Sequence, residues 1–263
     1  MQTNKVKELW RQGKPAAVGW MSTADPYTTE AMAEAGFDAL VLDMQHGMGI
    51  GPDRAVTWVQ LVARIGTTPF VRVPWNEPAY MQWVLDAGCL GVIVPLIGSY
   101  EDAAKAGGAC RYEPLGYRSV GPNRVRFMDG ADYFQKANEE IACLVMIEHI
   151  DTIPKLDEIA RAPGIDGFYI GPSDLAVTLG LGPGQDRKEP QHVEAVQQIL
   201  DAARRNNLVA GMHCAHAEEV TRRFKQGFQF CPAAVDVGLV TSGAQAALKQ
   251  VREATTAQTA GAR

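Results

Sequence analysis

Two carboxylates that follow short apolar runs are the residues of this chain best suited to chemistry. Glu148 follows the run 144–147, and Asp174 lies just past the run 167–170. Both runs are short and rich in β-branched or aromatic residues, so we predict buried strands. Residues 152–161 between them fit a helix. This strand–helix–strand order places both acids at the carboxyl edge of one parallel sheet.

Carboxylate oxygens that converge beside the Gly-Pro-Ser turn 171–173 suit a hard divalent cation such as Mg²⁺ or Mn²⁺. Such an ion would keep open positions for a substrate. The alternative is that the two acids only cap helices and face solvent at the strand ends. The spacing by itself leaves both interpretations open.

Further polar residues follow other predicted strands. Asp43 and His46 come after the second strand, Arg72 ends the third, and Asp86 lies late in the helix before the fourth. Together with the two acids, they fit metal-assisted chemistry on an anionic oxo acid, in which the arginine pairs with a carboxylate or a developing oxyanion. The alternatives are an ion pair at a barrel mouth for Arg72 and a helix-surface carboxylate for Asp86.

Several other features are weaker candidates. His213 and His216 could bind a transition metal, although we expect at least one of them to be a core or capping residue. His149 should point to the other face of its strand from Glu148. The glycines in 47–51 do not match a GxGxxG phosphate loop. No lysine ends a predicted strand, which argues against Schiff-base chemistry.

The elements that carry these residues alternate along the whole chain. Eight predicted strands, each with a helical partner, indicate one (β/α)8 TIM barrel spanning residues 1–263, with its active site at the carboxyl ends of the strands. The alternative is an open doubly wound sheet. Residues 111–130 form a long segment without clear pattern before the fifth strand, which predicts a functional loop. The predicted strands are residues 16–21, 39–43, 69–73, 91–96, 144–147, 167–170, 208–213 and 228–235.

The composition of the 263 residues is that of a soluble globular enzyme or binding protein, with 46% hydrophobic and 21% charged residues. The net charge of -5 gives no electrostatic case for nucleic acid as a partner. No apolar run approaches the roughly 20 residues of a membrane span, and the start of the chain has no signal core. The five cysteines form no CxxC pair, so we expect reduced thiols and a cytoplasmic location.

Six motifs occur in an order that resembles the HpcH/HpaI aldolase family. They are VLDMQHG at 41–47, FVRVP at 70–74, VLDAGCLGVIVP at 84–95, MIEH at 146–149, IGPSDLA at 170–176 and VDVG at 235–238. The family contains class II, metal-dependent pyruvate aldolases, including 4-hydroxy-2-oxoheptanedioate and 2-dehydro-3-deoxyglucarate aldolases. The resemblance covers nearly the whole chain, and IGPSDLA with the upstream glutamate is its most specific part.

The resemblance implies a role for each matching residue. Glu148 and Asp174 would hold the metal, with Mg²⁺ or Mn²⁺ expected and Co²⁺, Ni²⁺ or Zn²⁺ as alternatives. Arg72 would orient pyruvate and stabilise its enolate. His46 and Asp86 would form the pair that activates a metal-bound water. The remaining matches are Asp43 in the same hydrogen-bond network and Gly171, Pro172 and Ser173 in the turn that seats the pyruvate carboxylate.

The resemblance also implies a homohexamer whose subunits exchange the last helix, with sites near subunit contacts. Two residues depart from the family pattern. Gln45 replaces the glutamate that many members have before the active histidine, and Met146 replaces a glutamine that several have two residues before the metal glutamate. Each change removes a polar group near the site, so the outer shell of the metal and the substrate range could differ.

We therefore predict reversible cleavage of a 4-hydroxy-2-oxo acid into pyruvate, or a close analogue such as hydroxypyruvate, and an aldehyde. A second hypothesis is a CoA-ester lyase of the citrate-lyase β or malyl-CoA type, but the sequence has no clear basic cluster for the CoA phosphates. A remote alternative is a non-catalytic, metal-binding regulatory barrel. Arg118, Arg124 and Arg126 in the long loop could read a second carboxylate or could be solvated surface.

Overall fold

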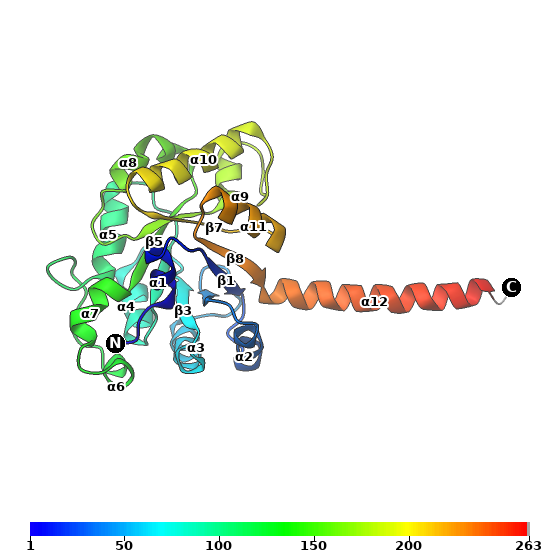
Figure 1. Ribbon diagram of the computed structural model, residues 1–263, viewed down its shortest axis with the longest axis horizontal. Helices are drawn as coiled ribbons and strands as arrows, with labels where there is room; N and C mark the ends of the chain where they lie inside the picture. Colours follow the sequence, from blue (N-terminus) through cyan, green and yellow to red (C-terminus); the bar gives the residue numbers. More distant parts are fainter. Residues whose placement is uncertain (262–263) are drawn as a thin grey trace.

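Eight parallel strands close into one barrel in chain order, with helices around the outside (Figure 1). The computed structural model describes residues 1–261. The predicted (β/α)8 barrel is confirmed. The strands are β1 Ala16–Met21, β2 Ala39–Asp43, β3 Thr68–Arg72, β4 Gly91–Val94, β5 Ala142–Ile147, β6 Gly167–Ile170, β7 Val209–Met212 and β8 Phe230–Val235. The helices are α1 Lys5–Arg11, α2 Pro26–Glu34, α3 Pro52–Ile65, α4 Pro78–Asp86, α5 Tyr100–Cys110, α6 Arg124–Asp129, α7 Tyr133–Glu140, η1 Ile150–Lys155, α8 Leu156–Ile159, α9 Pro172–Thr178, α10 Pro190–Arg205, α11 Ala217–Gln226 and α12 Asp236–Gly261.

Every second strand residue contributes to the barrel interior, because successive side chains of a strand point to opposite faces. The interior cluster contains Ala16, Val18, Trp20, Ala39, Val41, Phe70, Ile93, Ala142, Leu144, Met146, Tyr169 and Phe230. Continuing the same alternation past the last apolar residue of a strand brings polar side chains to the carboxyl end of the barrel. The residues in phase are Asp43, Arg72, Glu148 and His213.

The amino end of the barrel is closed by aromatic side chains. Trp10 of α1 packs edge-on against Phe70 and Phe230, with ring centroids 6.5 and 5.8 Å apart. Its indole nitrogen donates a hydrogen bond to the carbonyl of Gln229 at 3.0 Å. Gly91 makes room for Phe70, since a Cβ at that position would lie 2.1 Å from the ring. Catalytic chemistry is therefore restricted to the opposite, open end.

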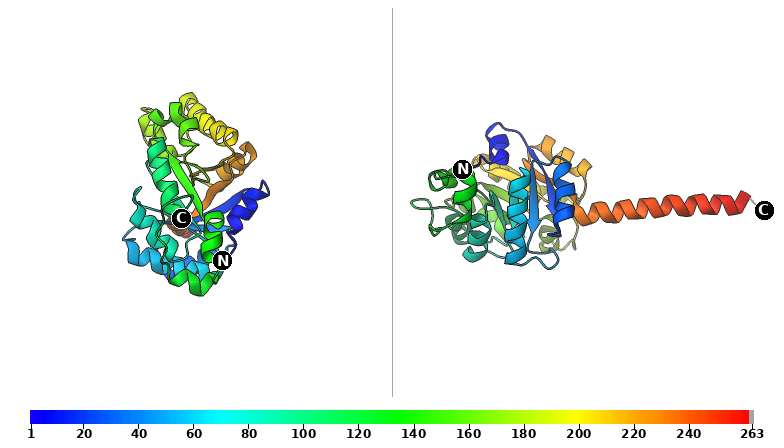
Figure 2. Two further views of the ribbon diagram at one scale, coloured as in Figure 1. Left: turned by 90° about the vertical axis from the view of Figure 1, so that its left-hand side faces the viewer. Right: turned by 90° about the horizontal axis from the view of Figure 1, so that it is seen from below.

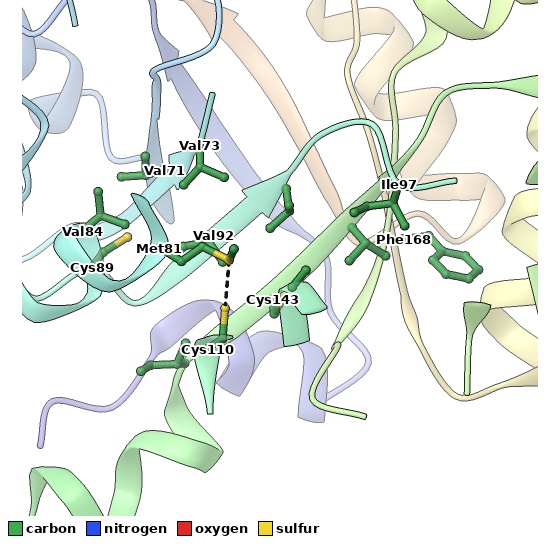
Figure 3. Close-up of a cluster of buried hydrophobic side chains, with 14 of the residues drawn as sticks. Val71, Val73, Met81, Val84, Cys89, Val92, Ile97, Cys110, Cys143 and Phe168 are labelled. Carbon is green, nitrogen blue, oxygen red and sulfur yellow. Dashed lines mark hydrogen bonds between the residues drawn. The ribbon is translucent and has the colours of Figure 1, made fainter. Parts of the chain in front are cut away.

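The other face of the strands packs against the helices. Val71, Val92 and Met81 of α4 belong to one buried apolar cluster (Figure 3). In this cluster, Cys110 of α5 contacts Met81, with the two sulfur atoms 3.8 Å apart, and interacts with Cys143 of β5. All five cysteines are buried and free, as the sequence predicted. This second apolar layer fixes the helices to the barrel, so the loops at the carboxyl end start from rigid supports.

Three segments differ from the prediction. The segment 111–130 contains helix α6, so it is not wholly irregular. Residues 152–161 form the short helices η1 and α8 instead of one continuous helix, with Pro154 inside η1. Asp174 lies within α9, a helix that was not predicted from the sequence. The missed helix begins at Pro172, where a proline is favourable because its nitrogen needs no partner in the first turn.

Helix α12 projects away from the barrel, as Figure 1 and the right-hand view of Figure 2 show. It begins directly after β8 and carries several exposed apolar side chains, which are Val237, Leu239, Val240, Leu248 and Val251. In the part of the chain that the structure describes, no helix combines the length and apolar character needed to cross a bilayer.

Candidate active site

A small pocket of about 190 Å³ lies at the carboxyl ends of the strands. Its lining residues are His46, Arg72, Met146, Gly171, Pro172, Ser173, Asp174, Gln185 and His213. The structure therefore brings together residues from four separate predicted motifs. We call this cavity the mouth pocket.

Asp43 and Arg72 form the rigid base of this end of the barrel. The guanidinium donates two hydrogen bonds to the carboxylate, from Nε to Oδ1 at 2.9 Å and from Nη2 to Oδ2 at 2.6 Å. The same carboxylate accepts the indole N–H of Trp20 at 3.3 Å. Burial would raise the pKa of Asp43, but these hydrogen bonds and the arginine charge outweigh it and lower the pKa. Asp43 is thus a permanent anion that fixes Arg72 over the Trp20 ring, 4.9 Å from its centroid.

Asp43 also positions His46. Its Oδ1 accepts the backbone N–H groups of Gln45 at 3.0 Å and His46 at 3.1 Å, which closes the turn after β2. The imidazole of His46 is exposed at the rim of the mouth pocket. A side chain so placed can exchange a proton with a ligand while its backbone is held by the strand end.

Glu148 is a buried carboxylate beneath the pocket lining. Its side chain is in phase with the interior of β5, and its Oε1 accepts the backbone N–H of Leu96 at 2.7 Å. Leu96 has a φ of 58°, which costs energy in a non-glycine residue and is typical of functional sites. Burial raises the pKa of Glu148, and the nearby charge of Asp174 adds to that increase. A cation between Glu148 and Asp174 would offset the energetic cost of burying their negative charge.

Gly171 lets the Glu148 carboxylate approach the backbone. A Cβ at this position would lie 2.3 Å from Oε2 of Glu148, so no other residue fits without displacing the acid. The turn is held from behind by His192 of α10, whose Nε2–H donates to the carbonyl of Pro172 at 3.0 Å. The exposed carboxylate of Asp174 follows in the first turn of α9.

Asp174 lines the pocket with Arg72 and His46, and Glu148 lies buried behind the lining residue Gly171, close enough for the charge of Asp174 to raise its pKa. Among the residues that the structure describes, no cluster of three or more histidine, cysteine or carboxylate side chains has the geometry of a metal site. A two-carboxylate donor set suits a hard cation that takes its other ligands from water and substrate oxygens. The raised pKa of Glu148 and the space left by Gly171 therefore fit a divalent ion.

Asp86 does not line the mouth pocket of its own chain. It ends α4, before β4 begins, and pairs with Arg118 at 2.7 Å. Arg118 is buried and stacks on the rings of Tyr112 and Tyr133, so it is neither a loop residue at the pocket nor solvated surface. The structure separates this ion pair from His46.

The other loop arginines also lie away from the mouth pocket. Arg124 donates to the carbonyl of Ala87, and Arg126 is exposed beside Phe134 in a separate aromatic cavity.

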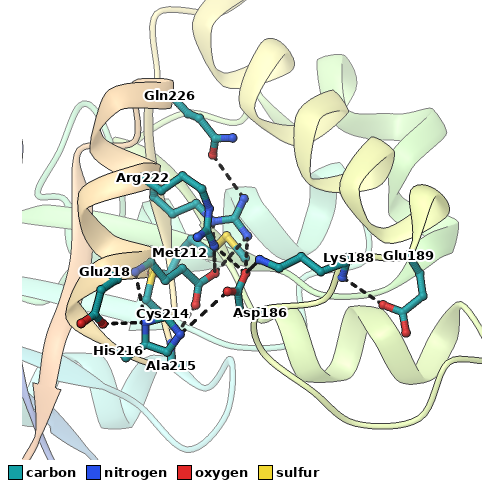
Figure 4. A network of polar contacts seen from close by, with 12 residues as sticks. Asp186, Lys188, Glu189, Met212, Cys214, Ala215, His216, Glu218, Arg222 and Gln226 are labelled. Carbon is teal, nitrogen blue, oxygen red and sulfur yellow. Dashed lines mark hydrogen bonds and ion pairs between the residues drawn. The ribbon is translucent and has the colours of Figure 1, made fainter.

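Gln185 lines the mouth pocket although its type and spacing did not predict a site residue; the glycine-rich loop 179–190 brings it there. Neighbouring residues anchor this loop. Asp186 pairs with Arg222 of α11 at 2.5 Å and with Lys188 at 2.6 Å (Figure 4). Arg187 donates to three loop carbonyls, those of Leu181, Gly182 and Pro183. The contacts of Asp186 and Arg187 exist only in the folded protein, so the sequence alone does not identify this loop as part of the site.

The remaining histidines separate into different roles. His216 caps α11 by accepting the N–H of Glu219, and His149 caps η1 by accepting the N–H of Asp151. The expectation that one residue of the 213–216 pair is a capping residue is therefore confirmed. His213, by contrast, lines the mouth pocket.

The sequence model of the HpcH/HpaI aldolase/citrate lyase family matches residues 17–243. The chain belongs to this family. The match spans the eight strands except the first residue of β1, and it includes every residue of the mouth pocket.

The chain is similar along most of its length to two named aldolases and to a family member of known structure. A hydroxypyruvate/pyruvate aldolase of Rhizorhabdus wittichii is 33% identical, over 95% of this chain and 99% of that protein. A 5-keto-4-deoxy-D-glucarate aldolase of Escherichia fergusonii is 36% identical, over 86% of this chain and 88% of its own length. The crystal structure of a family member from Burkholderia cenocepacia superposes with a TM-score of 0.87 and 28% identity, covering 95% of this chain and 100% of that one.

Proposed function

We propose that this protein is a pyruvate aldolase, a carbon–carbon lyase that reversibly cleaves a 4-hydroxy-2-oxo acid into pyruvate, or a close analogue such as hydroxypyruvate, and an aldehyde. The single observation that carries the proposal is the mouth pocket, where Arg72, His46 and Asp174 line one cavity with the buried Glu148 directly behind Gly171, in a chain of this family. The names of the similar aldolases, which act on related oxo acids, support the same reaction class.

We propose Glu148 and Asp174 as the ligands of a divalent cation, with Mg²⁺ or Mn²⁺ expected. When bound, such an ion would polarise the 2-oxo group of the substrate and offset negative charge on its oxygens. The buried Glu148 and the close backbone at Gly171 support this assignment.

Each protein side chain then has a defined task. Arg72, already fixed by Asp43, pairs with the oxygen on which charge develops when the bond between C3 and C4 breaks. The turn at Gly171, Pro172 and Ser173 seats the carboxylate of the oxo acid. His46, at the rim, removes the proton of the C4 hydroxyl, directly or through a water molecule. Reprotonation at C3 releases pyruvate.

Asp86 is the proposed partner of His46, and in this assignment a second copy of the chain supplies it. The proposal is a homohexamer with active sites near subunit contacts and with α12 exchanged between copies. The exposed apolar side chains of α12, including Val240 and Leu248, support a partner for this helix. Five buried free cysteines support a reducing, cytoplasmic location.

A CoA-ester lyase is the competing enzyme hypothesis. The citrate lyase β subunit of M. tuberculosis shares the fold at 17% identity with a TM-score of 0.56. A CoA ester needs a basic site for its phosphates, and among the described residues lining the mouth pocket Arg72 is the one arginine or lysine. This composition favours a small oxo acid.

One assay separates the hypotheses. Purified protein is incubated with several 4-hydroxy-2-oxo acids, and with malyl-CoA, with and without a chelator, and the release of pyruvate, or of acetyl-CoA and glyoxylate, is measured. Pyruvate release that depends on a divalent ion supports the aldolase, whereas cleavage of malyl-CoA alone to acetyl-CoA and glyoxylate contradicts it. Borohydride added with pyruvate should trap no covalent lysine adduct, because no lysine lines the described mouth pocket.

A further inference from the structure

His213 is placed differently from the other histidines of this chain. It extends the inward-facing phase of β7, is half-buried, and forms one wall of the mouth pocket together with Arg72 and Met146. Its Nδ1 lies 3.2 Å from the hydroxyl of Tyr169, a fully buried residue of the neighbouring strand β6. The imidazole edge contacts the ring of Trp20, with centroids 4.7 Å apart.

We propose that His213 is a substrate-binding residue, which donates a hydrogen bond from Nε2 to an oxygen of the pyruvate half of the substrate while Tyr169 fixes its ring. This inference rests on the proposed aldolase function and adds a residue to it. The ligand class is a 2-oxo acid whose oxygens lie between His213 and Arg72.

The hydrogen-bond partners decide which nitrogen carries the proton. The Tyr169 hydroxyl has one hydrogen to donate, and Nδ1 of His213 is its partner among the described residues. A buried hydroxyl that did not donate would leave its hydrogen unsatisfied. The tyrosine therefore donates to Nδ1, which places the hydrogen of the neutral ring on Nε2.

Nε2 is free to meet a ligand. In the described structure it has no protein partner, and it is not among the buried side-chain atoms left without one, so it is accessible at the pocket wall. Burial, with a smaller contribution from the charge of Arg72, lowers the pKa of His213 to about 4. The ring is thus neutral at physiological pH and acts as a donor of fixed orientation.

Trp20 contacts both hydrogen-bond donors of the proposed site, Arg72 and His213. Its ring carries the Arg72 guanidinium on its face and contacts the His213 ring as well. The pocket is small, about 190 Å³, and both side chains line it, so a three-carbon acid bound by Arg72 also lies within reach of His213. Both His213 and Met146 line the pocket, and His213 supplies a polar group where Met146 supplies none.

The test compares two substitutions that each keep a polar atom at one of the two ring-nitrogen positions. His213→Gln places an amide nitrogen near the position of Nε2, where it can still donate. His213→Asn places an amide oxygen near Nδ1, which can accept the Tyr169 hydroxyl but leaves no donor at the position of Nε2. Both variants are measured as metal-loaded protein. The readouts are kcat and KM for cleavage of a 4-hydroxy-2-oxo acid and the inhibition constant of oxalate, a stable analogue of the pyruvate enolate.

We expect His213→Asn to weaken oxalate binding and to lower kcat/KM by about ten- to hundredfold, the effect of losing a hydrogen bond to a charged oxygen. His213→Gln should retain activity within about fivefold of the native protein. Equal losses in both variants, or a loss in the glutamine variant alone, would overturn the proposal and leave His213 a structural residue. Unchanged oxalate binding in both variants would also overturn it.

Two controls keep this result separate from the proposed function. If the native protein releases no pyruvate from any 4-hydroxy-2-oxo acid, the aldolase proposal itself fails. If the native protein is active and the asparagine variant matches it, only the role of His213 fails. Thermal unfolding of both variants identifies any loss of fold, and Tyr169→Phe, which removes the hydroxyl that orients the ring, should cause a smaller loss in kcat/KM than His213→Asn.

Discussion

The two ends of the barrel use buried polar groups in opposite ways. At the amino end, Asn4 is fully buried, and its side chain accepts from the N–H groups of Val6 and Lys7 and donates to the carbonyls of Leu90 and Glu140. At the carboxyl end, Glu148 is just as inaccessible, but it lies near a second carboxylate. Both the oxygen and the nitrogen of the Asn4 side chain are hydrogen-bonded, whereas the mouth leaves charge that a ligand must neutralise.

Backbone geometry follows the same division. The residue that donates to Glu148 is Leu96, which adopts a positive φ, and Gly171 brings backbone close to the same acid. The amino end consists of aromatic contacts among Trp10, Phe70 and Phe230. Substitutions at the mouth should therefore change activity more than stability, and substitutions at the amino end should do the reverse.

The largest expected effect comes from removing the divalent ion. Chelation should abolish pyruvate release, because the charge of the enolate would then rest on Arg72 alone. Added Mn²⁺ or Mg²⁺ should restore the activity. Full turnover by protein shown to be metal-free by elemental analysis would contradict the mechanism.

Substitutions of Arg72 and His46 should separate two steps at the mouth. Arg72→Ala should reduce both aldol cleavage and oxaloacetate decarboxylation by about a hundredfold or more, since both pass through the pyruvate enolate. His46→Ala should reduce aldol cleavage by a factor on the order of a hundred and decarboxylation much less, because oxaloacetate has no C4 hydroxyl proton. Equal losses in both reactions for the histidine variant would assign it to binding instead.

Gly171→Ala tests the space beside Glu148. The added methyl group would lie 2.3 Å from the carboxylate and should displace it, which should weaken metal affinity by about ten- to hundredfold. Gly51→Ala is the matched control, because a Cβ there has no heavy atom within 4 Å. Metal titrations of both variants provide the measurement, and equal affinities would show that Glu148 does not depend on this glycine.

Asn4→Ala should have the reverse profile at the amino end. Loss of the helix cap and of two buried hydrogen bonds should lower the free energy of unfolding by about 1–3 kcal/mol. Activity per folded molecule should stay unchanged, because Asn4 is at the closed end of the barrel. Chemical denaturation together with the pyruvate assay tests both statements, and a selective loss of kcat would weaken the separation of the two ends.

The smallest expected effect is a pH dependence of stability that arises from His213. Its pKa falls from an ordinary value of 6.5 to about 4 in the folded protein. Above pH 6.5 neither state binds the proton, so the shift has no effect. As the pH falls from 6.5 towards 4, the unfolded chain binds a proton that the folded protein does not, and stability is lost.

His213→Phe removes this titration. The stability of the native protein relative to this variant should therefore decrease between pH 7 and pH 5, by on the order of 1 kcal/mol. Urea unfolding at the two pH values measures the difference. A relative stability that is the same at both values would mean that the histidine titrates normally.

The sequence by itself determined the barrel and much of its active end. Short apolar runs separated by helical segments predict a (β/α)8 barrel, and the alternation of side chains along a strand places Arg72 and Glu148 at the strand ends. Proline and glycine mark the helix boundaries, as at Pro26 and Gly66. These are local properties, so they can be read from neighbouring residues.

Only the tertiary structure decided which charges meet. Asp86 pairs with Arg118, which is 32 positions away, and Asp43 binds Arg72 and Trp20 from two different strands. The mouth pocket also gains Gln185 from the distant loop 179–190. Such partners depend on barrel closure and on the paths of loops, which bring together residues whose separation in the chain carries no periodic signal.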